Sequence, residues 1–171
     1  RAALGRYVIS EDERELPQVV ADLLVERGWT IATAEFGTGG LLAARLTEPE
    51  GSRRWFRRSI VLDAELAASE ESEGDDLVDE ETALTMAASA RKATGADVGV
   101  GVGEVVVPAD STPQRPYGVV HVAVNVRGRE TSRRLSFNGD RASVREWAAD
   151  AALALVRLWI LEQDEGNGRA R

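Results

Sequence analysis

Apolar residues in the first part of the chain switch between helical and strand spacing. Pro17 suits the first turn of a helix and Gly28 ends that helix. Between them lie four apolar residues at helical spacing, Val19, Val20, Leu23 and Leu24. Residues 29–35 form a short apolar run typical of a buried strand, and residues 38–48 return to helical spacing. The pattern therefore predicts a helix, a strand and a second helix in succession.

The middle of the chain continues this alternation. Residues 51–58 are expected to form a loop, and residues 59–62 a short strand. Asp79 is a suitable N-cap, and the two glutamates after it favour the positive end of a helix dipole. We expect this helix to run to about Thr94 and to be followed by a strand over residues 96–103.

The last third of the chain predicts a hairpin and a long helix. Residues 118–126 alternate and place valines on one face, namely Val120, Val122, Val124 and Val126. Residues 131–137 can pair with this strand across a turn at residues 127–129. Residues 140–161 then form an amphipathic helix.

Together these elements indicate one α/β domain. Because helices alternate with strands early and a hairpin follows, we predict a mixed β-sheet between helices, a three-layer α/β/α fold. The domain is expected to cover residues 17–162. Residues 1–16 are predicted to be a linker or the tail of an upstream segment, and residues 163–171 a disordered tail.

Composition narrows the function classes. The chain of 171 residues has no cysteine, which excludes disulfides, thiolate metal sites and cysteine nucleophiles and fits a cytoplasmic location. No stretch reaches the ~20 apolar residues of a membrane span, so we expect no membrane partner. The net charge of -8 disfavours direct binding of nucleic acid.

Few of the basic residues can act as a general base. Lys92 is the only lysine and His121 the only histidine, so nearly all of the 21 basic residues counted as Lys or Arg are arginine. Arginine stays protonated and does not act as a general base. We expect His121, opposite the valine face, to be packed under a helix.

The chain's most informative feature is the turn Glu35-Phe36-Gly37-Thr38-Gly39-Gly40 between a predicted strand and a predicted helix. Free backbone N–H groups at a helix start can bind a phosphate, nucleotide or carboxylate, whereas the glycines can also serve only to make the turn tight. Glu35 can orient the turn, but we favour a role as a cap for local N–H groups.

Other polar residues are weaker candidates for a ligand or partner site. The ten acidic residues between Asp63 and Glu81 can hold a divalent cation or form a solvated surface; we favour the surface and expect no metal. Asp140 with Arg141 and Arg145 can reach a phosphate, or can be a helix cap beside surface arginines. One basic cluster is a candidate partner or oligomer contact, or an ordinary exposed surface: Arg53, Arg54, Arg57 and Arg58.

The residues Thr33-Ala-Glu-Phe-Gly-Thr-Gly-Gly resemble the Ala-Glu-Ser-Cys-Thr-Gly-Gly signature of the C-terminal domain of competence/damage-inducible protein CinA, the nicotinamide-nucleotide amidohydrolase family. Further landmarks agree in order and spacing: Gly51-Ser52, Trp55-Phe56, Val78-Asp-Glu-Glu-Thr-Ala, Gly95-Ala96-Asp97, Thr112-Pro113, Phe137-Asn-Gly-Asp-Arg and Arg145. The resemblance spans about residues 16–161. It implies the three-layer fold, self-association and links to DNA uptake or damage responses.

The resemblance also implies a chemistry that this chain departs from. The family hydrolyses the amide of nicotinamide mononucleotide with a serine nucleophile helped by a tyrosine and a lysine. Those three positions correspond here to Phe36, Asp63 and Ala68. The family's glycine-rich substrate loop corresponds to residues 104–108, where β-branched valines stand. We expect valine side chains to fill the substrate pocket that the resemblance implies, in addition to the loss of its catalytic residues.

These observations lead to one main hypothesis and two alternatives. The chain is expected to be a CinA-type domain that has lost amidohydrolase activity and acts by binding or assembly, without a cofactor. The first alternative is a residual enzyme that activates water with Asp63 or Glu35, and the second is a nucleotide-binding sensor. Candidate ligand-binding residues are Glu35, Gly37, Thr38, Gly39, Gly40, Ser111, Thr112 and Arg141.

Overall fold

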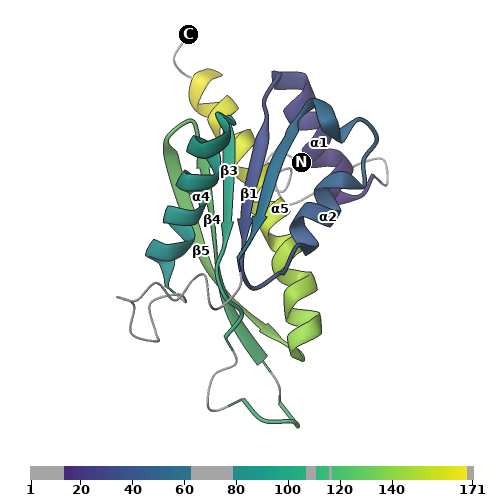
Figure 1. Cartoon of the computed structure of the whole chain (residues 1–171), viewed down its shortest axis with the longest axis vertical. Helices are drawn as coiled ribbons and strands as arrows, with labels where there is room; N and C mark the ends of the chain where they lie inside the picture. Colours follow the sequence, from purple (N-terminus) through teal and green to yellow (C-terminus); the bar gives the residue numbers. More distant parts are fainter. Residues whose placement is uncertain (1–13, 63–78, 107–110, 116, 169–171) are drawn as a thin grey trace.

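A five-stranded mixed sheet organises the computed structural model, which describes residues 14–62, 79–106, 111–115 and 117–168. The strand order is β2-β1-β3-β4-β5 (Figure 1). The strands are β1 (Ile31–Glu35), β2 (Phe56–Val61), β3 (Val98–Val102), β4 (Tyr117–Val126) and β5 (Arg129–Asn138). β1 pairs in parallel with β2 and β3, whereas β3–β4 and β4–β5 are antiparallel. The predicted mixed sheet is confirmed.

Helices cover both faces of the sheet. The helices are α1 (Leu16–Arg27), α2 (Leu41–Thr47), α4 (Glu80–Thr94), α5 (Arg141–Gly168) and the short 3-10 helix η2 (Ser52–Arg54). α4 lies on one face, and α1, α2 and α5 lie on the other (Figure 1). The valine face of β4 packs into the larger core under α5 with Leu153 and Val156. The three-layer α/β/α prediction is therefore confirmed.

Two glycines in β3 set how closely α4 approaches the sheet. A Cβ atom at Gly99 would lie 2.0 Å from the Ala87 carbonyl oxygen, and one at Gly101 would lie 2.1 Å from that of Ala83. The backbone of α4 thus rests directly on the backbone of β3. His121 of β4 faces the same layer, as predicted, since it pairs with Arg134 on the face opposite the valines.

The hairpin turn is tighter than the predicted one. Arg127 and Gly128 form a two-residue connection with φ of 52° and 93°, the geometry that matches the twist of the flanking strands. Arg127 is held by Asp97, whose Oδ1 accepts from Nε at 3.1 Å and Nη2 at 3.0 Å, and its guanidinium lies 4.9 Å from the Trp29 ring centroid.

Several element boundaries differ from the sequence-based prediction, and three of the differences are the largest. β2 begins at Phe56, within the predicted loop, and α2 begins at Leu41, after the predicted start at residue 38. α5 continues beyond Leu161 to Gly168. Near its end Arg129 Nη1 donates to Gln163 Oε1 at 2.7 Å, a contact across the fold that no local pattern shows. Residues 1–13 and 169–171 of the predicted linker and tail lie outside the described residues.

Candidate functional site

The turn between β1 and α2 is fastened to the neighbouring strand β3. The Phe36 N–H donates to the Val102 carbonyl at 2.9 Å, and the Gly37 N–H donates to the Gly103 carbonyl at 3.0 Å. Gly39 and Gly40 then adopt φ of 59° and 95°, values that side chains rarely tolerate. The glycines are therefore required by the backbone path of the turn.

Glu35 ends β1 and is fully buried, at 0% exposure. Its Oε2 accepts hydrogen bonds from Thr38 Oγ1 at 2.8 Å and from two backbone N–H groups, Gly40 at 3.1 Å and Leu42 at 3.0 Å. Its Oε1 accepts from the Ala43 N–H at 2.9 Å. Because these N–H groups form the start of α2, Glu35 is the cap of that helix.

Two hydroxyl groups complete the surroundings of the same carboxylate. Ser59 Oγ, from β2, donates to Glu35 Oε1 at 2.8 Å. Thr33 Oγ1 lies 2.8 Å from Ser59 Oγ and 3.3 Å from Glu35 Oε1. A buried charge is tolerated when donors surround it, and here they come from β1, β2 and α2. The result is a closed network that locks the turn.

This network bears directly on the anion-binding hypothesis. A phosphate at the start of α2 would use backbone N–H groups that point out of the helix. The N–H groups of Gly40, Leu42 and Ala43 are already bound to Glu35. The chain's own carboxylate thus takes the place at this helix start where an external anion would bind.

Phe36, the residue that the sequence resemblance aligns with a serine nucleophile, is half-buried. It packs against a small cluster between β1 and α4 that contains Ala32, Ala34, Met86, Ala90 and Ala96. A benzyl side chain has no atom that can attack an amide. Asp63 and Ala68, which the resemblance aligns with a tyrosine and a lysine, lie outside the described residues.

The loop after β3 presses against the same turn. Val105 is 1% exposed, and a Cβ atom on Gly37 would lie 2.6 Å from the Val105 nitrogen and 2.7 Å from its Cγ2. A valine side chain therefore occupies the space beside Gly37. Val107 lies outside the described residues.

Two arginines at the start of α5 tie the turn and this loop together. Arg141 Nη1 donates to the Val105 carbonyl at 2.9 Å, and Arg145 Nη2 donates to the Thr38 carbonyl at 3.0 Å. Arg145 also occupies the space above Gly39, where a Cβ would lie 2.4 Å from its Nη2. Each guanidinium group thus donates one hydrogen bond to the backbone at this site.

Ser111 and Thr112 serve their own loop. Ser111 Oγ accepts from the Tyr117 N–H at 3.0 Å, and Thr112 Oγ1 accepts from the Arg115 N–H at 3.2 Å. Among the described residues, no hydrogen bond joins either hydroxyl to the Gly37–Gly40 turn. Arg141 is thus linked to the turn because it bonds to Val105, which lies beside Gly37. Ser111 and Thr112 have no such link among the described residues.

Two further acidic candidates are helix caps. Asp140 Oδ1 accepts from the Ser143 N–H at 2.8 Å, and this bond lowers the pKa of Asp140 below its ordinary value. Asp79 Oδ1 accepts from the Thr82 N–H at 2.7 Å, which is the main cause of its lowered pKa, with His121 contributing a smaller electrostatic effect. Within the part of the chain that is described, no group of acidic or histidine side chains could hold a metal ion.

Sequence reasoning missed two contributors to this site. The sequence predicts Ser59 only as a strand residue, and Arg145 as a surface arginine or a phosphate contact and as a landmark of the family resemblance. The signal for Ser59 is its pairing with Thr33 in the β1–β2 register, which depends on where β2 begins.

A search of the described residues finds no helix long and apolar enough to cross a membrane.

The sequence of this chain is similar to that of known proteins. Residues 13–160 match the family model of the CinA C-terminal domain. A putative competence-damage inducible protein from Symbiobacterium thermophilum is 40% identical over 94% of this chain, and a CinA-like protein from Kosmotoga olearia is 34% identical over 94%. The chain spans only 42% and 41% of the length of these two relatives.

Solved structures agree with the sequence relatives. A CinA superfamily protein from Klebsiella pneumoniae superposes with a TM-score of 0.73 at 26% identity, covering 86% of this chain and 96% of that one. A competence or damage-inducible protein from Enterobacter asburiae gives a TM-score of 0.72 at 27% identity, covering 85% and 96%. The chain therefore belongs to the CinA C-terminal domain family.

Proposed function

We propose that this CinA C-terminal domain has lost nicotinamide mononucleotide amidohydrolase activity and acts as a binding or assembly module. The activity in question is the one that the family resemblance implies, hydrolysis of the nucleotide's amide to the acid and ammonia. The observation that supports the proposal is Phe36, which the sequence resemblance aligns with the family's serine nucleophile and whose side chain packs against the Ala32–Met86 cluster. Without a nucleophile, covalent amide hydrolysis has no first step.

Glu35 gives little support to the alternative of a residual enzyme. A general base must reach the proton it removes, directly or through one water. Glu35 is fully buried and its two oxygens already accept bonds from α2, Thr38 and Ser59. Asp63, the other candidate base, lies outside the described residues, so its role is left to experiment.

Release of ammonia from nicotinamide mononucleotide tests the proposal directly. We expect no turnover above a no-enzyme blank with purified wild-type protein. Phe36→Ala serves as a matched control, because it removes the benzyl group without adding a nucleophile. Turnover that Asp63→Ala abolishes would establish the residual enzyme instead.

A reconstruction experiment separates a missing nucleophile from a filled site. We expect the triple variant Phe36→Ser, Asp63→Tyr, Ala68→Lys to remain inactive, because Val105 occupies the space beside Gly37. Val105→Gly is then added as a fourth change, because it removes the side chain that occupies the space beside Gly37. Activity in the triple variant alone would show that the site is not filled.

The nucleotide sensor remains the second alternative and predicts saturable binding without turnover. Calorimetry with nicotinamide mononucleotide tests it, and absence of heat eliminates it. Gly39→Val is a poor probe here, because the new side chain would displace Arg145 as well as any ligand. The self-association that the family resemblance implies is measured on the same samples by sedimentation equilibrium.

A further inference from the structure

Among the described residues, β2 is one of the two edge strands of the sheet, and β1 is its only pairing partner there. The Leu62 N–H donates to the Glu35 carbonyl at 2.8 Å, so Leu62 directs its backbone groups toward β1. Backbone direction alternates along a strand, and the N–H and C=O groups of Ser59 and Val61 therefore point away from the sheet. Such a row of open backbone groups is a template for an additional strand.

Apolar side chains are exposed at the same edge. Val61 is 52% exposed and Ile60 is 37% exposed. Only two other large apolar side chains are this exposed among the described residues, Val25 and Trp147, and neither lies in a strand. Natural edges are usually protected by charge, by a bulge or by short length. The first half of β2 has two arginines and a register shift against β1, whereas its end carries apolar residues.

The first half of the edge is strongly basic. Arg57 and Arg58 of β2 and the two arginines of η2, Arg53 and Arg54, are all exposed. None of the four makes an ion pair or hydrogen bond with a described residue. This is a local positive surface on a chain whose net charge is -8.

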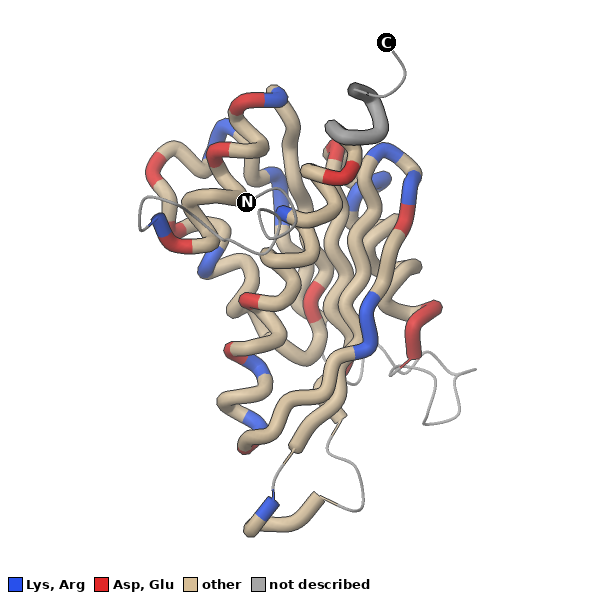
Figure 2. Tube along the Cα trace, turned by 180° about the vertical axis from the view of Figure 1, so that it is seen from behind, with Lys and Arg blue, Asp and Glu red and all other residues tan. Residues whose placement is uncertain are grey.

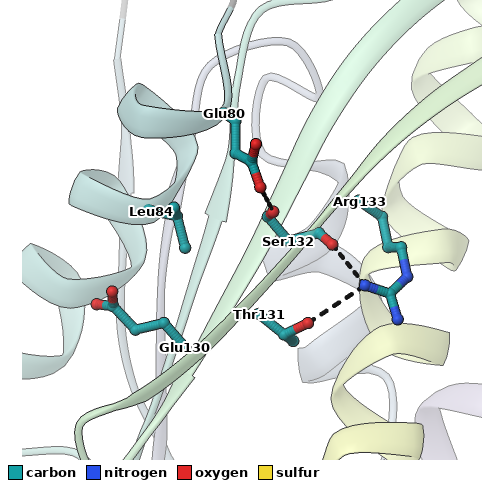
Figure 3. A pocket seen from close by; sticks show the side chains of 6 residues that line it. All are labelled: Glu80, Leu84, Glu130, Thr131, Ser132 and Arg133. Carbon is teal, nitrogen blue, oxygen red and sulfur yellow. Dashed lines mark hydrogen bonds between the residues drawn. The ribbon is translucent and has the colours of Figure 1, made fainter.

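The opposite edge behaves differently. On β5 the guanidinium of Arg133 is folded onto its own strand, with Nη1 donating to the Ser132 carbonyl at 2.7 Å and lying 3.3 Å from Thr131 Oγ1 (Figure 3). Ser132 in turn bonds to Glu80 of α4 (Figure 3). The β5 edge is thus partly satisfied from within the chain, whereas the arginines of β2 are not engaged. Charged positions lie mainly on the helices, turns and outer strands of the molecule (Figure 2).

We propose that the β2 edge binds an extended acidic segment of a partner protein as a sixth strand. Backbone groups of Ser59 and Val61 would pair with the added strand, and its carboxylates would meet Arg57 and Arg58. In this mode of recognition main-chain hydrogen bonds supply affinity and alternate side chains supply specificity. The unpaired arginines also accelerate encounter with an acidic partner.

A peptide fits this edge better than a nucleic acid does. Single-stranded nucleic acid is bound by a basic groove together with exposed aromatic rings on which bases stack. Two aromatic residues lie between the arginines: Trp55 is 2% exposed and belongs to the core, and Phe56 is partly buried and packs against the same core. The exposed Ile60 and Val61 match apolar side chains of a strand instead.

The inference deepens the proposed binding role by naming the class of partner. It does not depend on the fate of the amide chemistry, because the ammonia measurement and a peptide-binding measurement report on different residues. A negative result in either measurement therefore rejects only the proposal that it tests.

Fluorescence anisotropy with the intact protein tests the inference. The probe is a labelled six-residue peptide, Glu-Glu-Val-Val-Glu-Glu, about the length of a typical strand. Because neighbouring residues of a strand point to opposite faces, its carboxylates lie on both faces, as Arg57 and Arg58 do. We expect saturable binding that weakens about tenfold in Arg57→Glu/Arg58→Glu and by less than about twofold in the matched control Arg133→Glu/Arg134→Glu on the other edge. Circular dichroism checks that both variants are folded.

A second probe keeps the test decisive even if a variant unfolds. The same peptide with alternate backbone nitrogens methylated retains its charge but cannot pair as a strand, and we expect it not to bind the wild-type protein. Equal binding of both peptides would overturn the inference, as would equal losses in the two arginine variants. Binding of a single-stranded oligonucleotide in place of the acidic peptide would also overturn it.

Discussion

The two helices that begin near the same end of the sheet are both capped by a carboxylate, but in opposite ways. α4 is capped by Asp79, the residue directly before it, on the exposed surface. α2 is capped by Glu35, which lies at the end of β1 and reaches three N–H groups from inside the protein. The first cap fixes one helix end, whereas the second also joins β1, β2 and α2.

This difference shows how the glycine-rich turn keeps its shape without a bound anion. A helix start attracts negative charge because its N–H groups lack partners. At α2 those partners come from the fold, so the shape of the turn does not depend on an external ligand. At α4 the cap stabilises one helix and can be exchanged more freely.

The largest expected effect is that of Glu35→Ala. This change leaves buried N–H groups of α2 and the Ser59 hydroxyl without an acceptor, so we expect a loss of about 3 to 5 kcal/mol in the free energy of unfolding. Urea denaturation measures it. Glu35→Gln retains size and one acceptor oxygen and should cost clearly less. A loss no greater than that of Asp79→Ala would remove the contrast between the two caps.

The second prediction concerns the packing that accompanies the buried cap. Gly37→Ala places a Cβ 2.6 Å from both the Gly103 oxygen and the Val105 nitrogen. Because these are backbone atoms that cannot rotate away, we expect a loss of about 1 to 3 kcal/mol. Gly51→Ala is the comparison: its Cβ would meet nothing within 4 Å, so it measures the separate cost of a positive φ, which Gly37 does not have. An unchanged stability in Gly37→Ala would show that the turn and the loop are not tightly packed.

The third prediction measures the exposed cap of α4. Asp79→Ala removes the acceptor for the Thr82 N–H, and we expect a loss of about 1 kcal/mol, the usual cost of losing an N-cap. Asp79→Ser keeps an acceptor oxygen and should restore most of the stability. If Asp79→Ser is as destabilising as Asp79→Ala, the effect comes from charge rather than from the hydrogen bond.

The same contrast shows how much of this protein could be predicted from its sequence. Asp79 and Gly95 bracket α4 within one continuous stretch, so local rules placed both ends of that helix correctly. The alternating valines of β4 likewise predicted a strand and its buried face. Each of these signals lies within a few residues of the structure it determines.

The buried cap could not be fully predicted in this way. Glu35 was interpreted as a cap from its position at a strand end, but its partnership with Ser59 depends on the parallel register of β1 and β2. Local patterns also placed the start of α2 three residues early, because the residue that caps it lies outside the helix. The contact of Arg145 with Thr38 joins residues 107 positions apart, and no spacing rule predicts it.

The smallest predicted effect is a pH dependence confined to the exposed caps. Backbone N–H groups of Thr82 and Ser143 lower the pKa values of Asp79 and Asp140 below the ordinary 3.8. Each carboxylate therefore stabilises the fold above that value, and the contribution is lost as the pH falls through the lowered pKa, because the unfolded chain takes up the proton first.

Asn can cap a helix but cannot titrate in this range, so Asp79→Asn/Asp140→Asn isolates the effect. Urea denaturation from about pH 5 to about pH 2.5 should show a shallower fall in stability for this variant than for the wild type. Asp97→Asn, which changes a carboxylate that pairs with Arg127 instead of capping a helix, is the comparison. If the double variant has the same slope as the wild type, the exposed caps do not contribute through their charge, and the acid sensitivity of the fold must come from other carboxylates.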